Sequence, residues 1–133
     1  MVCPYCKKDS QVVNSRIQKR ANSVWRRRKC PKCSAVWTTH ERIEATTTYR
    51  VSKDGHLLMF RPEELLVSLY EALRHKKAAA SSAKYVCDTV VQQLQAKHVA
   101  VLPTELIAKT TYNILRRYDK PAAAVYKARY LHT

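Results

Sequence analysis

Four of the five cysteines stand in two Cys-x-x-Cys pairs, a spacing that lets two thiolates face one metal ion. The pairs are Cys3/Cys6 in CPYC and Cys30/Cys33 in CPKC. Two such turns complete a tetrahedral zinc site, which is closed and leaves no coordination position for a substrate. We therefore predict one structural Zn²⁺ in a zinc ribbon. Two disulfides are the alternative, but the N-terminal residues include no apolar signal segment, so we expect a reducing cytoplasm and free thiols.

The rest of the sequence offers no grouping of residues that would support catalysis, so we do not expect an enzyme. Its histidines outside the ribbon, at positions 56, 75, 98 and 132, are scattered. Cys87 lies in a helical pattern and is expected to be a small buried apolar residue. A single glycine, Gly55, excludes the glycine-rich phosphate loops of common nucleotide-binding folds.

The net charge of +15 predicts a polyanionic partner. Residues 1–50 hold 12 basic and 3 acidic residues, and residues 51–133 hold 13 and 7, so the excess is greatest around the cysteines. Neutralising phosphates releases condensed counterions, which gives affinity for nucleic acid without reading its bases. No apolar run of about 18 residues is present, so we expect no membrane role.

The basic residues of the first 45 positions are the candidates for contacting nucleic acid. On a strand, Arg26 and Arg28 would share one face while Trp25 and Arg27 share the other. Arginine can bond phosphate oxygens and read guanine in the major groove. A solvated basic surface is the alternative, and Trp25, Trp37 and Tyr5 are expected to cover the metal site. The candidates are Arg16, Arg26, Arg27, Arg28, Lys29 and Arg42, of which Arg16, Arg26, Arg28 and Arg42 are favoured.

Residues 46–133 predict a second domain, in which a β-hairpin packs on a helical bundle. The hairpin is expected over residues 46–60, with its turn at Asp54-Gly55. Apolar spacing predicts helices from Pro62 to a basic end at residues 75–77, from about residue 82 to 97, over 103–118, and from 121 onward. Residues 78–81 and 99–102 are expected to be connectors. The fold class is therefore α+β, with a zinc ribbon at residues 1–45 and a second domain at 46–133.

The order of these features resembles the bacterial NrdR family, the zinc-ribbon and ATP-cone repressors of ribonucleotide reductase genes. The resemblance spans nearly the whole chain. It rests on CPYC, Val13-Asn14-Ser15-Arg16, Ser23–Cys30 (SVWRRRKC), Thr38-Thr39-His40-Glu41-Arg42, Val51–Gly55 (VSKDG) and Val101–Ile107 (VLPTELI).

The resemblance implies a cytoplasmic homo-oligomeric repressor that binds double-stranded operator DNA. Its ATP-cone would bind ATP or dATP as an allosteric effector, and nucleotide would change the oligomeric state. Two ribbons presented together would also gain affinity through avidity. The nucleotide-binding residues that it implies here are Val51, Lys53 and, after a one-residue insertion, Arg129.

The second domain departs from the family pattern where the nucleotide would bind. Ser52 replaces a basic residue, and Glu64 stands in place of a lysine that would attract a triphosphate. Two other interpretations therefore stay open. One is a zinc-ribbon protein that binds DNA constitutively without nucleotide control, and the other is a basic zinc protein that binds RNA or the ribosome.

Overall fold

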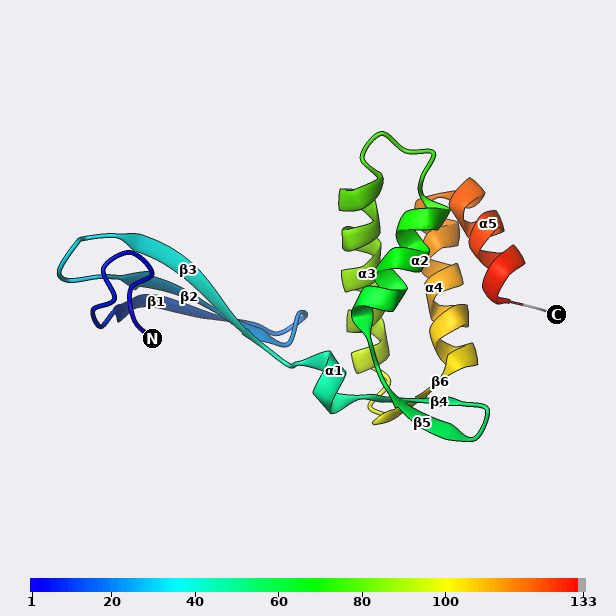
Figure 1. Ribbon diagram of the computed structural model, residues 1–133, viewed down its shortest axis with the longest axis horizontal. Helices are drawn as coiled ribbons and strands as arrows, with labels where there is room; N and C mark the ends of the chain where they lie inside the picture. Colours follow the sequence, from blue (N-terminus) through cyan, green and yellow to red (C-terminus); the bar gives the residue numbers. More distant parts are fainter. Residues whose placement is uncertain (132–133) are drawn as a thin grey trace. The chain divides into compact units, whose positions relative to one another are not determined.

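The computed structural model describes residues 1–131 and divides into two compact units, Met1–Ile43 and a second that begins at Glu44 (Figure 1). Strands make up the first unit, and helices with a small sheet make up the second, which confirms the α+β class. The boundary expected after residue 45 lies two residues beyond the observed one. His132 and the last position of the expected second domain lie outside the described residues. Within residues 1–131, no helix is long and apolar enough to cross a membrane.

The first unit is a three-stranded antiparallel sheet in the order β1-β2-β3. Its strands are β1 (Gln11–Gln18), β2 (Ser23–Lys29) and β3 (Val36–Arg42). The turn between β1 and β2 uses Asn22 at φ 43°, a left-handed conformation that asparagine tolerates. A bulge between Val12 and Asn14 shifts the register of β1 against β2. Because all of β1 is exposed, this sheet has little apolar core of its own.

The predicted hairpin forms β4 (Arg50–Lys53) and β5 (His56–Met59), and its turn residues Asp54 and Gly55 have φ of 48° and 78°. Residues 46–48 are not part of it, contrary to expectation. They belong to the short helix α1 (Ala45–Thr48), where the hydroxyls of Thr47 and Thr48 donate to the Glu44 carbonyl. These local hydrogen bonds compete with extended backbone.

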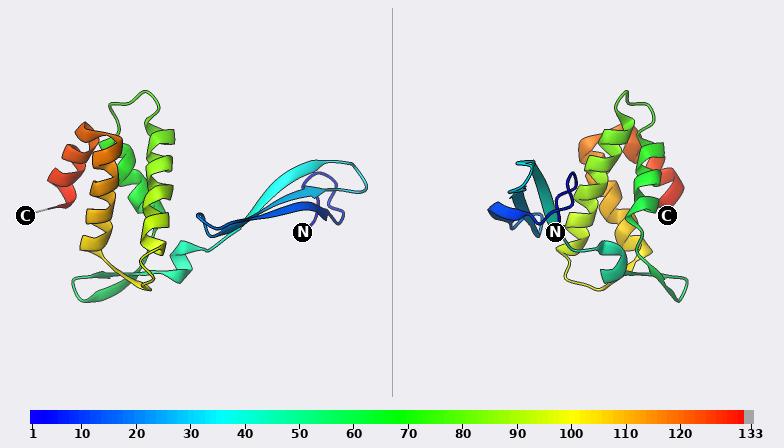
Figure 2. Two further views of the ribbon diagram at one scale, coloured as in Figure 1. Left: turned by 180° about the vertical axis from the view of Figure 1, so that it is seen from behind. Right: turned by 60° about the vertical axis from the view of Figure 1, so that its left-hand side comes forward.

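Four longer helices complete the second unit: α2 (Pro62–Ala72), α3 (Ala79–Gln95), α4 (Thr104–Tyr118) and α5 (Lys120–Tyr130). Their apolar faces bury a core that includes Leu69, Leu73, Val90 and Leu115. Both rotated views show the helices side by side above the β4–β5 hairpin (Figure 2). Cys87 is buried in this core, as predicted, and its thiol donates to the Pro62 carbonyl at 3.5 Å. Burial raises its pKa to about 11, so it stays a thiol.

Both expected connectors are partly regular structure. Residues 79–81 form the first turn of α3, consistent with the high helix propensity of alanine. Residues 101–103 form β6 (Val101–Pro103), which pairs parallel with β4. A three-residue strand whose partner lies about fifty positions away leaves no local pattern to detect.

Helix α2 ends earlier than predicted, at Ala72. The basic residues His75 and Lys76 therefore lie in the connection to α3. They bind Asp119 instead, at 3.2 Å and 3.1 Å. Asp119 is the N-cap of α5, where its side chain accepts the Ala122 N–H at 2.9 Å. That N–H, followed by the Lys76 and His75 bonds, lowers the pKa of Asp119 despite partial burial. One carboxylate thus joins the α2–α3 connection to the α4–α5 junction.

Candidate metal centre and nucleic-acid interface

Each Cys-x-x-Cys segment folds into a knuckle, and the two knuckles have the same backbone hydrogen bonds. In the first, the Lys7 N–H donates to the Cys3 carbonyl at 3.0 Å and the Cys3 N–H to Lys8 at 2.7 Å. In the second, Ser34 donates to Cys30 at 3.0 Å and Cys30 to Ala35 at 2.9 Å. The fifth residue of each is left-handed, with φ of 60° at position 7 and 59° at position 34. The repeated geometry turns both cysteines of each knuckle toward the same point.

The four thiols meet in one cluster. All four Sγ atoms lie within 4.8 Å of one another. The Cys3–Cys33 separation is 3.6 Å and the Cys6–Cys30 separation is 3.5 Å. A disulfide would require about 2 Å, so the cysteines are free. Zinc–sulfur bonds of about 2.3 Å give tetrahedral edges of about 3.8 Å, so the cluster fits one zinc ion coordinated by four thiolates.

The pKa values of the four clustered thiols also favour binding of a metal cation. The Cys33 N–H is the main reason that the pKa of Cys30 falls to about 7, against the effect of burial. The pKa of Cys3 is lowered as well, because N–H groups of its own knuckle outweigh burial. At Cys33 the Ala35 N–H lowers the pKa, but burial and the three neighbouring thiols raise it to about 12. Four thiolates this close repel one another, and a bound divalent cation removes the repulsion.

Little else holds the ribbon together. In residues 1–43 the buried side chains are Cys3, Ser23 and Cys30 alone. Tyr5, expected to cover the metal site, is 73% exposed. Trp25 does not cover it either, because it lies five strand residues from Cys30, about 16 Å away at ~3.3 Å per residue. Metal coordination therefore has to supply the stability that apolar burial does not.

The register of the sheet shows which basic side chains share a face. Directly opposed residues of an antiparallel pair project to the same side. Trp25 is opposite Arg16 on β1 and His40 on β3, and Arg27 is opposite Asn14 and Thr38. We call this side of the sheet the tryptophan-25 face. Its cations are Arg16, Arg27, Lys29 and Arg42.

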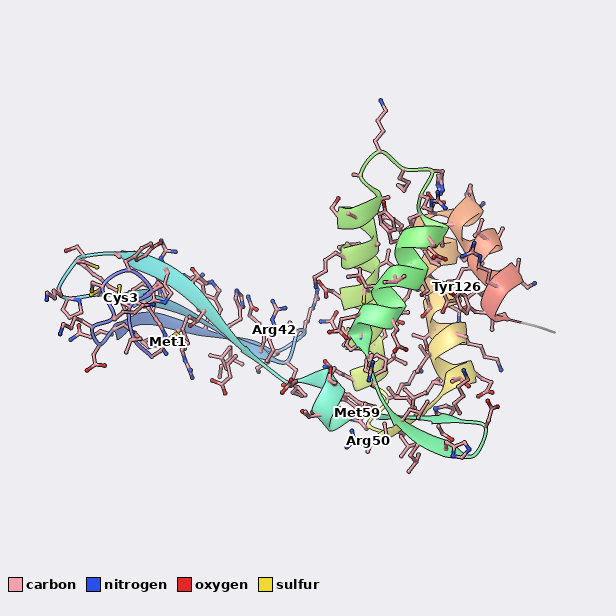
Figure 3. All side chains as sticks on the ribbon, in the orientation of Figure 1. Met1, Cys3, Arg42, Arg50, Met59 and Tyr126 are labelled. Carbon is pink, nitrogen blue, oxygen red and sulfur yellow. The ribbon has the colours of Figure 1, made fainter. Side chains whose placement is uncertain are left out.

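The tryptophan-25 face carries exposed cations and no carboxylate. All four of its basic residues are exposed. The guanidinium of Arg16 lies 5.7 Å from the Trp25 ring centre, and Arg27 donates to the Thr38 hydroxyl at 3.0 Å. These contacts hold the two arginines on the sheet while leaving donors for a ligand. Figure 3 shows Arg42 far along the ribbon from Cys3, so the face extends away from the metal site.

Arg26 and Arg28 project from the opposite side, as the strand alternation predicted, and both are half-buried. Arg26 forms an ion pair with Glu41 at 2.9 Å. Arg28 donates to Thr39 and to Ser10, each at 3.3 Å. These bonds tie β2 to β3 and to the first knuckle. The six basic candidates therefore do not form one row, and the four favoured from sequence are divided between two faces.

Three further residues on the tryptophan-25 face, Asn14, Thr38 and His40, were not among the nucleic-acid-binding residues predicted from the sequence. Alternation along a strand separates its residues into two faces. It does not tell which residues of β1 lie on the same face of the sheet as Trp25 of β2. That match depends on the bulge beside Val13, which no sequence signal marks.

The structure does not bring the three nucleotide candidates together. Val51 lies on β4 and packs against the core, and Lys53 is exposed at the end of the same strand. Arg129 on α5 is instead paired with Glu71 in the last turn of α2. The ion pair holds Arg129 beside the last turn of α2, whereas the hairpin leads into the first turn of the same helix.

Two knuckles on a small antiparallel sheet, with four convergent thiols, define a zinc-ribbon protein. Residues 1–41 match the family described as "Transcriptional repressor NrdR-like, N-terminal domain". Two relatives named "Transcriptional repressor NrdR" are each 34% identical to the chain and align with 96% of it and 86% of their own length. They come from Fervidobacterium nodosum (strain ATCC 35602 / DSM 5306 / Rt17-B1) and Janthinobacterium sp. (strain Marseille). The relative from Herminiimonas arsenicoxydans has the same identity over 85% of its length.

The chain therefore belongs to the NrdR family, and its four-cysteine cluster is the zinc site of that family's ribbon. The relatives are named as transcriptional repressors and not as enzymes, which supports the non-enzymatic role predicted from the sequence.

Proposed function

We propose that this protein is a zinc-dependent transcriptional repressor that binds double-stranded DNA with the tryptophan-25 face of its ribbon. The observation that carries the proposal is the placement of four exposed cations on one side of the sheet, while Glu41, the one carboxylate of β1–β3, lies on the other side. The target genes are those that the family resemblance implies, the ribonucleotide reductase genes. Such a role places the protein in the cytoplasm.

On this face the side chains have distinct uses. The major groove of B-DNA admits a two-stranded β-ribbon, and the β1–β2 hairpin, which carries Arg16, Arg27 and Lys29, is such an element. Arg27 and Arg16 present forked donors to guanine edges or phosphates, while Lys29 supplies a simpler positive charge. Arg42, at the end of β3, extends the phosphate contacts away from the metal site. On the other side, Arg26 and Arg28 keep the strands and the first knuckle in register.

The second unit is proposed to be the regulatory and oligomerisation domain, with ATP or dATP as its effector. Nucleotide can shift the assembly only if it binds one oligomer better than another. Lys53 is exposed at the hairpin and has no carboxylate partner within residues 1–131, so it is free to meet a phosphate. The charge of Glu64 is partly offset by Arg61, 3.8 Å away. Val51 would pack under the base or ribose.

Replacing Lys53 with alanine should weaken ATP and dATP binding about tenfold or more, because a charge-assisted bond to phosphate is worth roughly 1.5–3 kcal/mol. Arg129→Ala should change the affinity little, since its partner is Glu71. Calorimetric titration of the zinc-loaded protein, with its mass followed in parallel, measures both effects. The matched control is Lys97→Ala, an exposed lysine after α3.

Absence of any binding heat at millimolar nucleotide would contradict the regulatory part of the proposal. The protein would then be a constitutive DNA-binding protein whose second unit serves only in assembly. DNA binding by the ribbon does not depend on this outcome.

A further inference from the structure

The second unit carries a cluster of positive charge that neither zinc nor nucleotide binding uses. It lies where the α2–α3 connection meets the α4–α5 junction, at the end of the helices opposite to the β4–β6 sheet (Figures 1 and 2). We name it the basic end. It consists of the exposed residues Arg74, Lys77, Arg116, Arg117 and Lys120.

The two segments of the basic end are fixed to each other. Lys76 and His75 both bind Asp119 Oδ2, at 3.1 Å and 3.2 Å. The Lys76 ammonium also lies 4.9 Å from the centre of the Tyr118 ring. The Tyr118 hydroxyl in turn donates to Ser82 on α3 at 3.0 Å. The backbone segments that carry the cations are therefore fixed to each other before binding and do not have to be ordered by a ligand.

No carboxylate neutralises the five exposed cations. Asp119 is the one acidic residue in the segments 74–77 and 116–120, and its oxygens are taken up by Ala122, His75 and Lys76. Nearby Glu71 is paired with Arg129. Among residues 1–131, none of the five cations has a carboxylate oxygen within 4.0 Å. Uncompensated like charges on one surface repel one another, and a polyanion removes this repulsion.

Aromatic rings lie beside the cations. Tyr85 is 63% exposed and Tyr118 is 39% exposed, with their ring centres 5.8 Å apart. Tyrosine hydroxyls are among the donors that bond DNA phosphates and sugars, and the Tyr85 side chain is exposed here. An anionic lipid surface would instead require apolar side chains that insert, and the exposed rings here are both tyrosines, one of them hydrogen-bonded in place.

We propose that the basic end is a second phosphate-binding surface, which contacts the backbone of the duplex bound by the ribbon and reads no bases. This inference rests on the proposed function, because the ribbon supplies the first contact. Linking a weak electrostatic surface to a second binding module raises the overall affinity through effective concentration. The basic end adds affinity and salt sensitivity, and the ribbon provides whatever sequence preference there is.

The test measures DNA affinity as a function of salt for the full zinc-loaded chain, using a duplex of about 40 base pairs. Each phosphate contact contributes about −0.9 to the slope of log affinity against log salt. The variant Arg74→Ala/Lys77→Ala/Lys120→Ala removes three cations that form no ion pair with residues 1–131 and should reduce the slope by about 2.7. The control Lys97→Ala/Lys109→Ala/Lys127→Ala removes three exposed lysines elsewhere on the unit and should leave it unchanged.

A wild-type slope in the basic-end variant, or an equal loss in both triple variants, would overturn the proposal. Binding of the wild type to phosphatidylserine vesicles, lost in the basic-end variant while the DNA slope is kept, would assign the surface to lipid and overturn it too. A different result would contradict the proposed function of the ribbon: DNA binding by Arg27→Ala/Arg42→Ala as tight as that of the wild type.

Discussion

Replacing Cys30 with serine should release the zinc ion and unfold residues 1–43 while the helices of the second unit remain folded. Cys30 is fully buried and its sulfur lies 3.5 Å from that of Cys6, at the centre of the cluster. Zinc coordination contributes roughly 10–16 kcal/mol to small metal-held folds. The ribbon buries only three side chains, so no apolar core can replace that contribution. Metal analysis and amide-proton dispersion measure the loss.

The matched control is Cys87→Ala, which removes the buried cysteine outside the cluster. It should keep one zinc per chain and lower the free energy of unfolding of the second unit by about 1 kcal/mol. Retention of zinc and of ribbon dispersion in the Cys30 variant would contradict a four-thiolate structural site.

Replacing Arg27 and Arg42 with alanine should reduce the affinity for duplex DNA at least a hundredfold without releasing zinc. Both side chains are exposed on the tryptophan-25 face. Each charge-assisted bond to DNA is worth roughly 1.5–3 kcal/mol, and two such losses correspond to a factor of about 100 or more. Fluorescence anisotropy with labelled duplex, alongside zinc analysis, measures both quantities.

The control for this pair is Arg26→Ala/Arg28→Ala on the other side of the sheet. Because these arginines bond Glu41, Thr39 and Ser10, their loss should lower ribbon stability more than it lowers DNA affinity. If Arg26→Ala/Arg28→Ala lost more DNA affinity than Arg27→Ala/Arg42→Ala, the assignment of the DNA-binding face would be contradicted. Structured RNA of matching length serves as competitor, and a preference for it would favour the RNA-binding interpretation instead.

Much of the fold follows from local sequence patterns. The elements that the sequence did not predict are the ones that depend on contacts between distant residues. The turn at Asp54-Gly55 and the leucine spacing of α2 are local signals, and both were interpreted correctly. Strand β6 exists because it pairs with Arg50–Ser52, a contact that local spacing does not reveal. Past the early end of α2, His75 and Lys76 likewise bind Asp119, which lies 44 and 43 positions away, respectively.

The functional site divides in the same way. The cysteine spacing alone indicates the metal cluster, because each knuckle is a local structure. The grouping of the arginines depends on how three strands pair. Alternation correctly separated Arg26 and Arg28 from Arg27, but only the register, with its bulge near Val13, places Arg16 and Arg42 on the side of Arg27.

The most direct test of the DNA-binding face uses the two tryptophans, which report on opposite sides of the ribbon. Trp25 lies between Arg16 and His40, while Trp37 is opposite Arg28. The measurement is the shift of their indole N–H resonances when duplex DNA is added to ¹⁵N-labelled, zinc-loaded protein. We predict that the Trp25 resonance moves and that of Trp37 stays nearly unchanged. Movement of the Trp37 resonance with an unchanged Trp25 would contradict the assignment of this face.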